Sequence, residues 1–312
     1  MYLSQTNGPA IYCYDTVAET VEHMAKCGFT HVDVSFYTRF MKGSVYFTDE
    51  YKRIIEEYKE AFRRYGVTPV QSHEPVGNSI GDDGGEYYMK KTPRAIEMAA
   101  KIGCPSITLH TGSANQYEMT KEQFVEGNVK ALKKLLPYAE EYGIELLVEN
   151  TGLSGLKERH GRYAATAQDL IDIVDEINHP LLAVNWDVGH AACCGLDAYA
   201  EMKTLGRRIR GVHIHDNMGF RRHTVDDRSY EGDMHTLPLF WSIDFDAIIR
   251  ALLDIGYEGT FNFEVDAPKG LLKYVDGRPD LLAKARDIRV EIDTLLYSIG
   301  RLLLEKYNCF EG

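Results

Sequence analysis

Residues 120–149 read TKEQFVEGNVKALKKLLPYAEEYGIELLVE and contain the two kinds of segment from which the rest of the chain is built. Thr120–Tyr142 carries apolar residues at helical spacing and stops before Gly143, a residue that commonly ends helices. Ile144–Glu149 is a short apolar run typical of a strand, and it ends in a carboxylate. The stretch therefore predicts a helix, a glycine stop and a strand.

The same order of helix, glycine and strand recurs along the chain, and such alternation predicts parallel strands joined by helical crossovers. We expect helices at Thr16–Cys27, Asp49–Tyr65, Glu86–Ile102, Thr120–Tyr142, Phe245–Ile255 and Leu281–Glu305. We expect strands at His31–Ser35, Val67–His73, Ser106–His110, Ile144–Glu149, Leu181–Asp187, Arg210–His215 and Thr260–Glu264, with an eighth near Tyr2–Ser4.

An open doubly wound sheet and a closed barrel both fit this alternation, and the polar residues at the strand ends distinguish them. An open sheet gathers its ligand residues at one switch point, whereas a closed barrel brings every strand end to one centre. Nearly every predicted strand here ends in a histidine or a carboxylate. We therefore predict an α/β fold, a single (β/α)8 TIM barrel spanning residues 1–312, with an active-site loop at about 217–241.

Composition excludes several classes of protein. The 312 residues include 34 aromatic side chains, 20 Tyr, 12 Phe and 2 Trp, which is too many for a disordered chain. There is no run of about 20 apolar residues to span a membrane and no secretory signal, so we expect a cytoplasmic protein. The six cysteines form no C-x-x-C pair and are expected to be reduced. A net charge of −12 disfavours binding to nucleic acid or to anionic membranes.

The strand ends collect residue types that bind divalent metals. Six of the eleven histidines lie at these ends or in the loop after the seventh strand, together with several carboxylates. A single strand-end histidine is usually a hydrogen-bonding residue, and His31, His160 and His179 are interpreted in that way; Glu149 alone would fit an ion pair. The joint pattern at successive strand ends favours a metal site. The candidates are His73, His110, Glu149, Asp187, His190, His213, His215, Asp233, His235 and Glu264.

These residues stand in motifs that resemble the xylose isomerase-like TIM-barrel superfamily, which includes sugar isomerases and epimerases, inosose dehydratases and endonuclease IV enzymes. The resemblance extends from about the second strand to the eighth, and it depends on the order and spacing of the motifs together. They are LVEN (147–150), DVGH (187–190), HIHD (213–216), GDMH (232–235), IDF (243–245) and FEV (263–265).

The resemblance implies two alternative metal sites. In the sugar isomerase and epimerase branch, one divalent ion is held by a quartet that matches Glu149, Asp187, His213 and Glu264. In the endonuclease IV branch, three ions are held by nine ligands, and the five further positions are also present here: His73, His110, His190, Asp233 and His235. The ligand inventory leaves one ion or several open. We expect one ion, Mn²⁺, with Mg²⁺, Co²⁺ or Zn²⁺ as alternatives.

Two features favour the sugar branch. The negative net charge is unsuited to a polyanionic duplex, and no basic run is present. A glycine-containing loop of the family is replaced after Pro238 by Leu239–Ser242, where Phe240 and Trp241 would form a substrate wall or pack the loop onto the barrel. The absence of glycine from residues 239–242 favours an unphosphorylated sugar, because phosphate sites in barrels often use glycine-rich turns.

The resemblance and the candidate residues together predict a metal-dependent sugar isomerase or epimerase acting on a ketose, keto-sugar or related glycoside. Glu149 and Glu264 would move a proton on opposite sides of the sugar through a metal-stabilised enediolate. His215 and Asp216 are expected to orient ligands or hold hydroxyl groups. The alternatives are a lyase or dehydratase that begins with the same proton abstraction, and an endonuclease IV-like phosphodiesterase. We expect a small sugar substrate and possible homo-oligomers.

Overall fold

Eight parallel strands pair side by side in the order β7-β6-β5-β4-β3-β2-β1-β8. The computed structural model describes residues 1–37, 44–75, 77–81, 85–112, 119–151, 163–219, 233–266, 268, 271–275 and 278–312. The strands are β1 (Leu3–Thr6), β2 (His31–Ser35), β3 (Thr68–His73), β4 (Ser106–His110), β5 (Glu145–Glu149), β6 (Leu182–Asp187), β7 (Ile209–His213) and β8 (Phe261–Phe263). The predicted strands are therefore all present.

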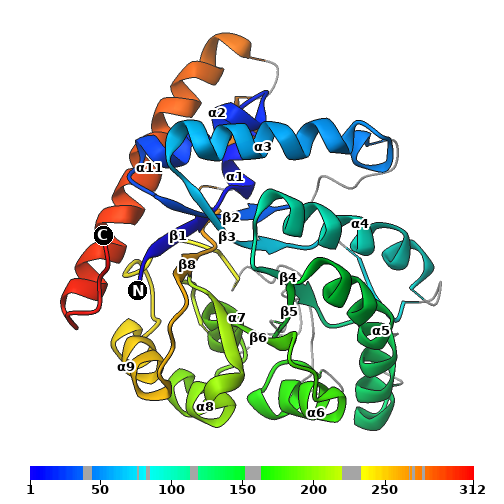
Figure 1. Cartoon of the computed structure of the whole chain (residues 1–312). Coiled ribbons are helices and arrows are strands. Elements are labelled where there is room, and N and C mark those ends of the chain that lie inside the picture. Colours follow the sequence, from blue (N-terminus) through cyan, green and yellow to red (C-terminus); the bar gives the residue numbers. More distant parts are fainter. Residues whose placement is uncertain are drawn as a thin grey trace.

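The sheet closes on itself between β7 and β8. Ile214, just beyond β7, forms a parallel bridge with Phe263. The Ile214 amide donates to the carbonyl of Asn262 at 2.8 Å, and the Glu264 amide donates to the carbonyl of Ile214 at 3.0 Å. The chain forms one (β/α)8 barrel, as predicted (Figure 1). Because β7 and β8 are held by this short ladder, they end before His215 and Glu264, which the sequence analysis had included in the strands.

Helices surround the barrel and pack their apolar faces on it (Figure 1). They begin where capping residues satisfy the first amides; for example, Thr120 and Gln123 form a reciprocal capping box. The helices are α1 (Gly8–Ile11), α2 (Val17–Lys26), α3 (Tyr51–Tyr65), α4 (Glu86–Ile102), α5 (Lys121–Tyr142), α6 (Ala167–Ile177), α7 (Val188–Cys193), α8 (Ala198–Leu205), α9 (Phe245–Ile255), α10 (Leu271–Tyr274) and α11 (Pro279–Glu305).

Five of these helices were not predicted, namely α1, α6, α7, α8 and α10, and α1 and α10 have only four residues each. α6 ends at Asn178, which adopts the left-handed backbone (φ 46°) that glycine supplies elsewhere in this chain. The glycine that marks the end of other helices in the sequence is therefore absent from the end of α6. α7 is only six residues long and begins directly at Asp187, and α8 is also short. Together, α6 to α8 complete the outer layer between β5 and β7.

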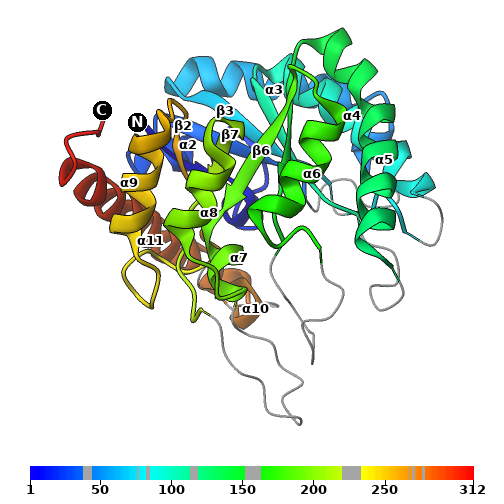
Figure 2. The same ribbon diagram turned by 90° about the horizontal axis from the view of Figure 1, so that it is seen from below.

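The long helix α11 packs beside β1, α2 and α9 in the outer layer (Figure 1). The two chain ends meet at the end of the barrel where the strands begin, because the Met1 amino group donates to the carbonyl of Cys309 at 2.5 Å and to the Glu311 carboxylate at 2.8 Å. At the opposite, C-terminal end of the strands lie α7 and α10 (Figure 2). Over the described residues, every helix is too short or too polar to cross a membrane.

Candidate metal centre

Four residues from neighbouring strands converge at the C-terminal end of the barrel. Glu149, Asp187 and His213 are the last residues of β5, β6 and β7, and Glu264 follows β8 directly. One ligand atom from each lies within 4.8 Å of every other. Nδ1 of His213 lies 2.5 Å from Glu149 Oε1, 3.3 Å from Glu264 Oε2 and 3.9 Å from Asp187 Oδ2. Parallel pairing of the strands brings these side chains together, because three of them end their strands and Glu264 directly follows β8.

Burial makes this quartet electrostatically unusual. Glu149, Asp187 and His213 are fully buried, and only Glu264 is partly exposed. Burial raises the pKa of Glu149, but the His213 imidazole outweighs that effect and holds this pKa well below its ordinary value. Conversely, burial lowers the pKa of His213, and Glu149 and Glu264 raise it well above its ordinary value. The quartet thus carries concentrated negative charge that needs a positive partner.

The donor atoms fit a divalent cation. Glu149 Oε2 and His213 Nδ1 are buried and form ion pairs with neighbouring ligand-type residues, at 3.2 Å from His110 Nε2 for the former and 2.5 Å from Glu149 Oε1 for the latter. Carboxylate oxygens and an imidazole nitrogen are ligands that Mn²⁺, Mg²⁺, Co²⁺ and Zn²⁺ all accept. A cation bound among the four residues would take the place of the proton that His213 holds beside these carboxylates.

Two histidines extend the quartet along β3 and β4. Nε2 of His73 lies 3.6 Å from Glu149 Oε2 and 3.9 Å from Glu264 Oε1. Nε2 of His110 lies 3.2 Å from the same Glu149 oxygen. His73, His110 and Glu149 therefore form a second group of potential ligands, which shares Glu149 with the quartet.

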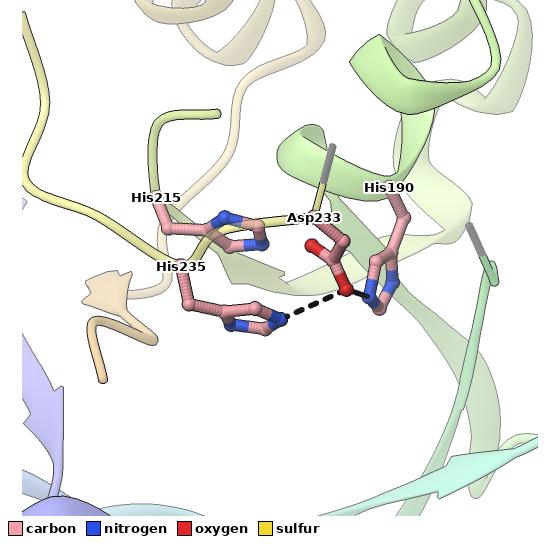
Figure 3. Close-up of side chains that lie close together, drawn as sticks. All are labelled: His190, His215, Asp233 and His235. Atoms are coloured by element: carbon pink, nitrogen blue, oxygen red, sulfur yellow. Dashed lines mark hydrogen bonds and ion pairs between the residues drawn. The ribbon is translucent and has the colours of Figure 1, made fainter. Parts of the chain in front are cut away.

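A third group lies on the other side of Asp187 and is drawn in Figure 3. Asp233 Oδ2 lies between two histidines, 3.6 Å from His190 Nε2 and 3.2 Å from His235 Nε2 (Figure 3). The rings of His215 and His235 stack with centroids 3.9 Å apart, and His215 Nε2 contacts both Asp187 oxygens at 3.1 Å. All of the sequence candidates for metal binding thus meet in three adjoining groups.

Neighbouring carboxylates raise the pKa of two histidines in the outer groups. Burial lowers the pKa of His73, but Glu149 and Glu264 outweigh it and raise that pKa to about 9. The same competition, with Asp233 as the main opposing charge, raises the pKa of His235 to about 9. These raised pKa values favour protonated imidazoles of His73 and His235 beside the carboxylates at neutral pH when no cation is bound. Metal binding must displace these protons.

A layer of polar residues beneath the site was missed by the sequence analysis. The Gln71 amide lies 2.8 Å from His213 Nε2, which directs Nδ1 toward Glu149. The Asn185 amide donates to Glu149 Oε1 at 2.9 Å. The buried Glu74 carboxylate accepts the backbone amide of His110 at 2.7 Å. The signal for these residues was a polar side chain within or directly after an otherwise apolar strand. Such outer contacts orient metal ligands and set their basicity.

The loop after β7 contributes differently from what was expected. Asp216 accepts the amides of Asn217 at 2.9 Å, Trp241 at 2.8 Å and Ile243 at 3.2 Å, so it braces the loop backbone. Asp216 also pairs with Thr236 in an antiparallel bridge. Phe240 and Trp241 are 58% and 48% exposed and do not line the cavity at the metal centre. Residues 220–232 of the predicted loop lie outside the described residues.

A cavity of about 480 Å³ opens over the three groups, a volume typical of small-molecule sites. One side is lined by potential metal ligands and the other by small, apolar and aromatic side chains that follow β1 and β2. Tyr37 bridges the two sides, because its ring makes an edge contact with His73 at 5.5 Å. The lining residues are Thr6, Gly8, Pro9, Ile11, Tyr12, Ser35, Tyr37, His73, His110, Thr151, His190, Asp233, His235, Glu264 and Asp266.

Several proteins of known sequence are similar to this chain. The protein MJ1311 of Methanocaldococcus jannaschii is 27% identical over 173 residues, 54% of this chain and 54% of MJ1311, so the match spans about half of that relative. An inosose isomerase of Bacillus velezensis is 23% identical over 227 residues, covering 69% of this chain and 73% of the relative. A ketose 3-epimerase of Arthrobacter globiformis is 22% identical, covering 64% and 60%.

Solved structures have the same fold. A D-tagatose 3-epimerase-like protein superposes with a TM-score of 0.68 at 20% identity, covering 96% of this chain and 99% of that one. The IOLI protein with a bound zinc atom superposes with a TM-score of 0.66 at 17% identity, covering 95% and 99%. The family model of the xylose isomerase-like TIM barrel matches residues 21–289. The chain therefore belongs to the xylose isomerase-like TIM-barrel family.

Proposed function

We propose that this protein is a divalent-metal-dependent sugar isomerase or epimerase that acts on a ketose, keto-sugar or related glycoside. The observation that carries the proposal is the buried quartet, in which Glu149 and Glu264 each lie within 3.3 Å of Nδ1 of His213 and Glu264 lines the cavity. Relatives named inosose isomerase and ketose 3-epimerase support the reaction class.

The two glutamates are suited to proton transfer. A proton on a carbon next to a carbonyl is weakly acidic, so its removal needs a nearby carboxylate base. Glu149 ends β5, whereas Glu264 follows β8 and lines the cavity, so the two carboxylates come from strands that are not adjacent in the barrel. One carboxylate would take the proton and the other would return it. When bound, a divalent cation would stabilise the negative oxygen that forms as the proton leaves.

We propose one tightly bound ion, held by Glu149, Asp187, His213 and Glu264. Mn²⁺ is our first expectation, with Mg²⁺, Co²⁺ or Zn²⁺ as alternatives, and the zinc bound in the IOLI structure supports a divalent ion in this family. His73, His110, His190, Asp233 and His235 would then contact the substrate or hydrogen-bond the ligands. His215 contacts Asp187 and would hold that ligand in place.

The direct test follows exchange of the substrate proton. Protein loaded with Mn²⁺ is incubated in D₂O with D-fructose, D-tagatose, D-psicose, inosose and a 3-keto-glucoside, and NMR follows deuterium incorporation and the products. We expect exchange at a carbon next to the carbonyl, with a new epimer or isomer. A product that has lost water would instead identify the dehydratase alternative. Absence of exchange in every sugar would contradict the proposal.

The third group of ligands supports a second candidate function, a multinuclear metallo-phosphodiesterase. Asp233, His190 and His235 offer a second centre beside the quartet, as an endonuclease IV-like site would require. The net charge of −12 argues against it, since such an enzyme must gather a polyanionic substrate. Elemental analysis of protein purified without added metal, with anomalous scattering at the zinc and manganese edges, gives the ion count. Two or three stoichiometric ions would favour hydrolysis of a duplex containing abasic sites.

A further inference from the structure

A second, smaller cavity adjoins the one over the metal centre. It measures about 260 Å³ and shares Pro9, Tyr12 and Asp266 with the larger cavity. Its remaining walls are Cys13, Pro268, Leu271 at the start of α10 and Arg289 of α11. A cavity of this size is below the usual range of about 300–1,000 Å³ for independent ligand sites. It is better suited to hold one end of a ligand whose other end lies over the metal centre.

The charges around the smaller cavity favour a neutral group. Arg289 lines it, is 3% exposed and binds Asp293 through Nε at 2.7 Å and through Nη2. Asp266 places a second carboxylate near the same guanidinium, and both carboxylates raise the pKa of Arg289 against the effect of burial. One buried cation thus faces two carboxylates. A phosphate or carboxylate group entering the cavity would be repelled by Asp266.

Apolar and aromatic surfaces complete the cavity. Pro9, Pro268 and Leu271 give it apolar walls. Tyr12 lines both cavities and is 56% exposed. An aromatic ring stacks on another ring or on the apolar face of a sugar, and its hydroxyl offers a hydrogen bond. These surfaces suit an aryl group or a second sugar.

We propose that the smaller cavity binds the distal group of a neutral glycoside, so that the substrate is a keto-glycoside rather than a free monosaccharide or a sugar phosphate. The proposal rests on the proposed function. In a glycoside the anomeric carbon is an acetal, so the carbonyl that acidifies the neighbouring C–H must be a ring ketone. A carboxylate removes that proton and a carboxylate returns one to the opposite face. The reaction is an epimerisation that needs no oxidant or reductant.

The test compares substrates and variants with metal-loaded protein. The probes are 4-nitrophenyl 3-keto-β-D-glucopyranoside, D-fructose and D-fructose 6-phosphate. We expect the lowest KM for the keto-glycoside. Leu271→Trp should fill the cavity and raise that KM about tenfold, while Tyr12→Ala, which removes one stacking ring, should raise it severalfold. Leu271→Trp should leave the KM for D-fructose unchanged, because Leu271 lines the smaller cavity and is absent from the lining of the larger one. Tyr274→Ala is the matched control, because Tyr274 lies on the same helix α10 as Leu271 and is 86% exposed.

A binding measurement separates this proposal from the proposed function. Saturation-transfer NMR detects contact between the protein and the nitrophenyl protons of 4-nitrophenyl β-D-glucopyranoside without turnover. Saturation of those protons in the wild-type protein and its loss in Leu271→Trp would support the subsite, even if no sugar is converted. Absence of saturation in the wild-type protein would overturn the proposal. An equal effect of Leu271→Trp on the keto-glycoside and on D-fructose would also overturn it.

Discussion

Two parts of this molecule gather the same types of side chain and differ in how many carboxylates each cationic group must balance. The first is the quartet at the C-terminal end of the barrel. The second lies where α2 packs on α11, where His23, Cys27 and Asp293 also bring ligand-type atoms within 4.8 Å of one another. Both groups are buried, so residue type and burial do not distinguish a metal site from a structural network.

In the contact between α2 and α11, the polar atoms satisfy one another. His23 bonds through Nδ1 to the Tyr14 hydroxyl at 3.0 Å and through Nε2 to Asp293 at 2.7 Å. Both Asp293 oxygens also receive the Arg289 guanidinium. Burial, assisted by Asp293, raises the pKa of Cys27 to about 12, so its sulfur remains a thiol rather than the thiolate that metals bind. This network needs no cation and joins two helices.

At the barrel end, by contrast, the quartet brings three carboxylates around one imidazole, that of His213. The positions of Glu149 and His213 are fixed by Asn185 and Gln71 from outside the quartet. A fixed group with more carboxylates than cationic partners is what a divalent cation requires. The comparison predicts that substitutions in the quartet abolish function, whereas substitutions between α2 and α11 affect stability.

The largest effect is expected for Glu149→Gln. It removes a proposed metal ligand and a proposed proton acceptor while conserving the shape of the side chain, so kcat should fall about 10⁴-fold, the upper end for a general acid–base group. Rates of deuterium exchange in a ketose measure the change. Glu145→Gln is the control, because Glu145 begins the same strand at its other end and pairs with Arg210 on the surface. Equal activity of the two variants would exclude Glu149 from the chemistry.

Arg289→Met should produce the largest loss of stability. Removing one partner of a buried ion pair costs about 3–5 kcal/mol, because the Asp293 carboxylate is left buried without its main counter-charge. Urea unfolding of metal-free protein measures the free energy. Arg301→Met, which breaks an exposed pair with Glu305 on the same helix, should change it by less than about 1 kcal/mol. Similar losses in both variants would refute a special role for the buried network.

Asp187→Ala and His213→Ala should each weaken metal binding by more than about 100-fold, the upper end of effects seen when residues behind the ligands are changed. Metal titration of the purified variants gives the affinity. His23→Ala should leave metal affinity unchanged in the folded protein, because His23 belongs to the satisfied network. If His23→Ala lost the metal and His213→Ala kept it, the assignment of the two regions would be reversed.

Much of the barrel and the convergence of its candidate ligands could be predicted, because strand ends display their chemistry directly in the sequence. Glu149 and Asp187 each follow an apolar run, and parallel pairing brings such ends to one edge. The prediction failed where the local signal was atypical. α6 ends at Asn178 rather than glycine, so its helical pattern was not recognised.

Other features depend on contacts that no local pattern contains. Gln71 and Asn185 come from separate strands and meet only inside the closed barrel, 3.5 Å apart. His23 and Asp293 are separated by 270 positions in the chain. Whether the ligands hold one ion or several also depends on side chains shared between groups, such as Glu149. Spacing along the sequence does not determine which candidate ligands would bind the same ion.

The smallest expected effect concerns acid stability, and it also separates the two regions. Burial raises the pKa of Asp293, but Arg289 and His23 outweigh it and hold this pKa below its ordinary value. A carboxyl with a lower pKa in the folded protein adds stability above its unfolded pKa, about 3.9, and loses it as pH falls through the folded value. The difference in unfolding free energy between wild-type protein and Asp293→Asn should therefore shrink below pH 4, by about 1.4 kcal/mol for each tenfold change in proton affinity. Urea unfolding of metal-free protein between pH 7 and pH 3 measures this difference. A difference that stayed constant over that range would mean that the network stabilises the two helices through shape rather than through the Asp293 charge.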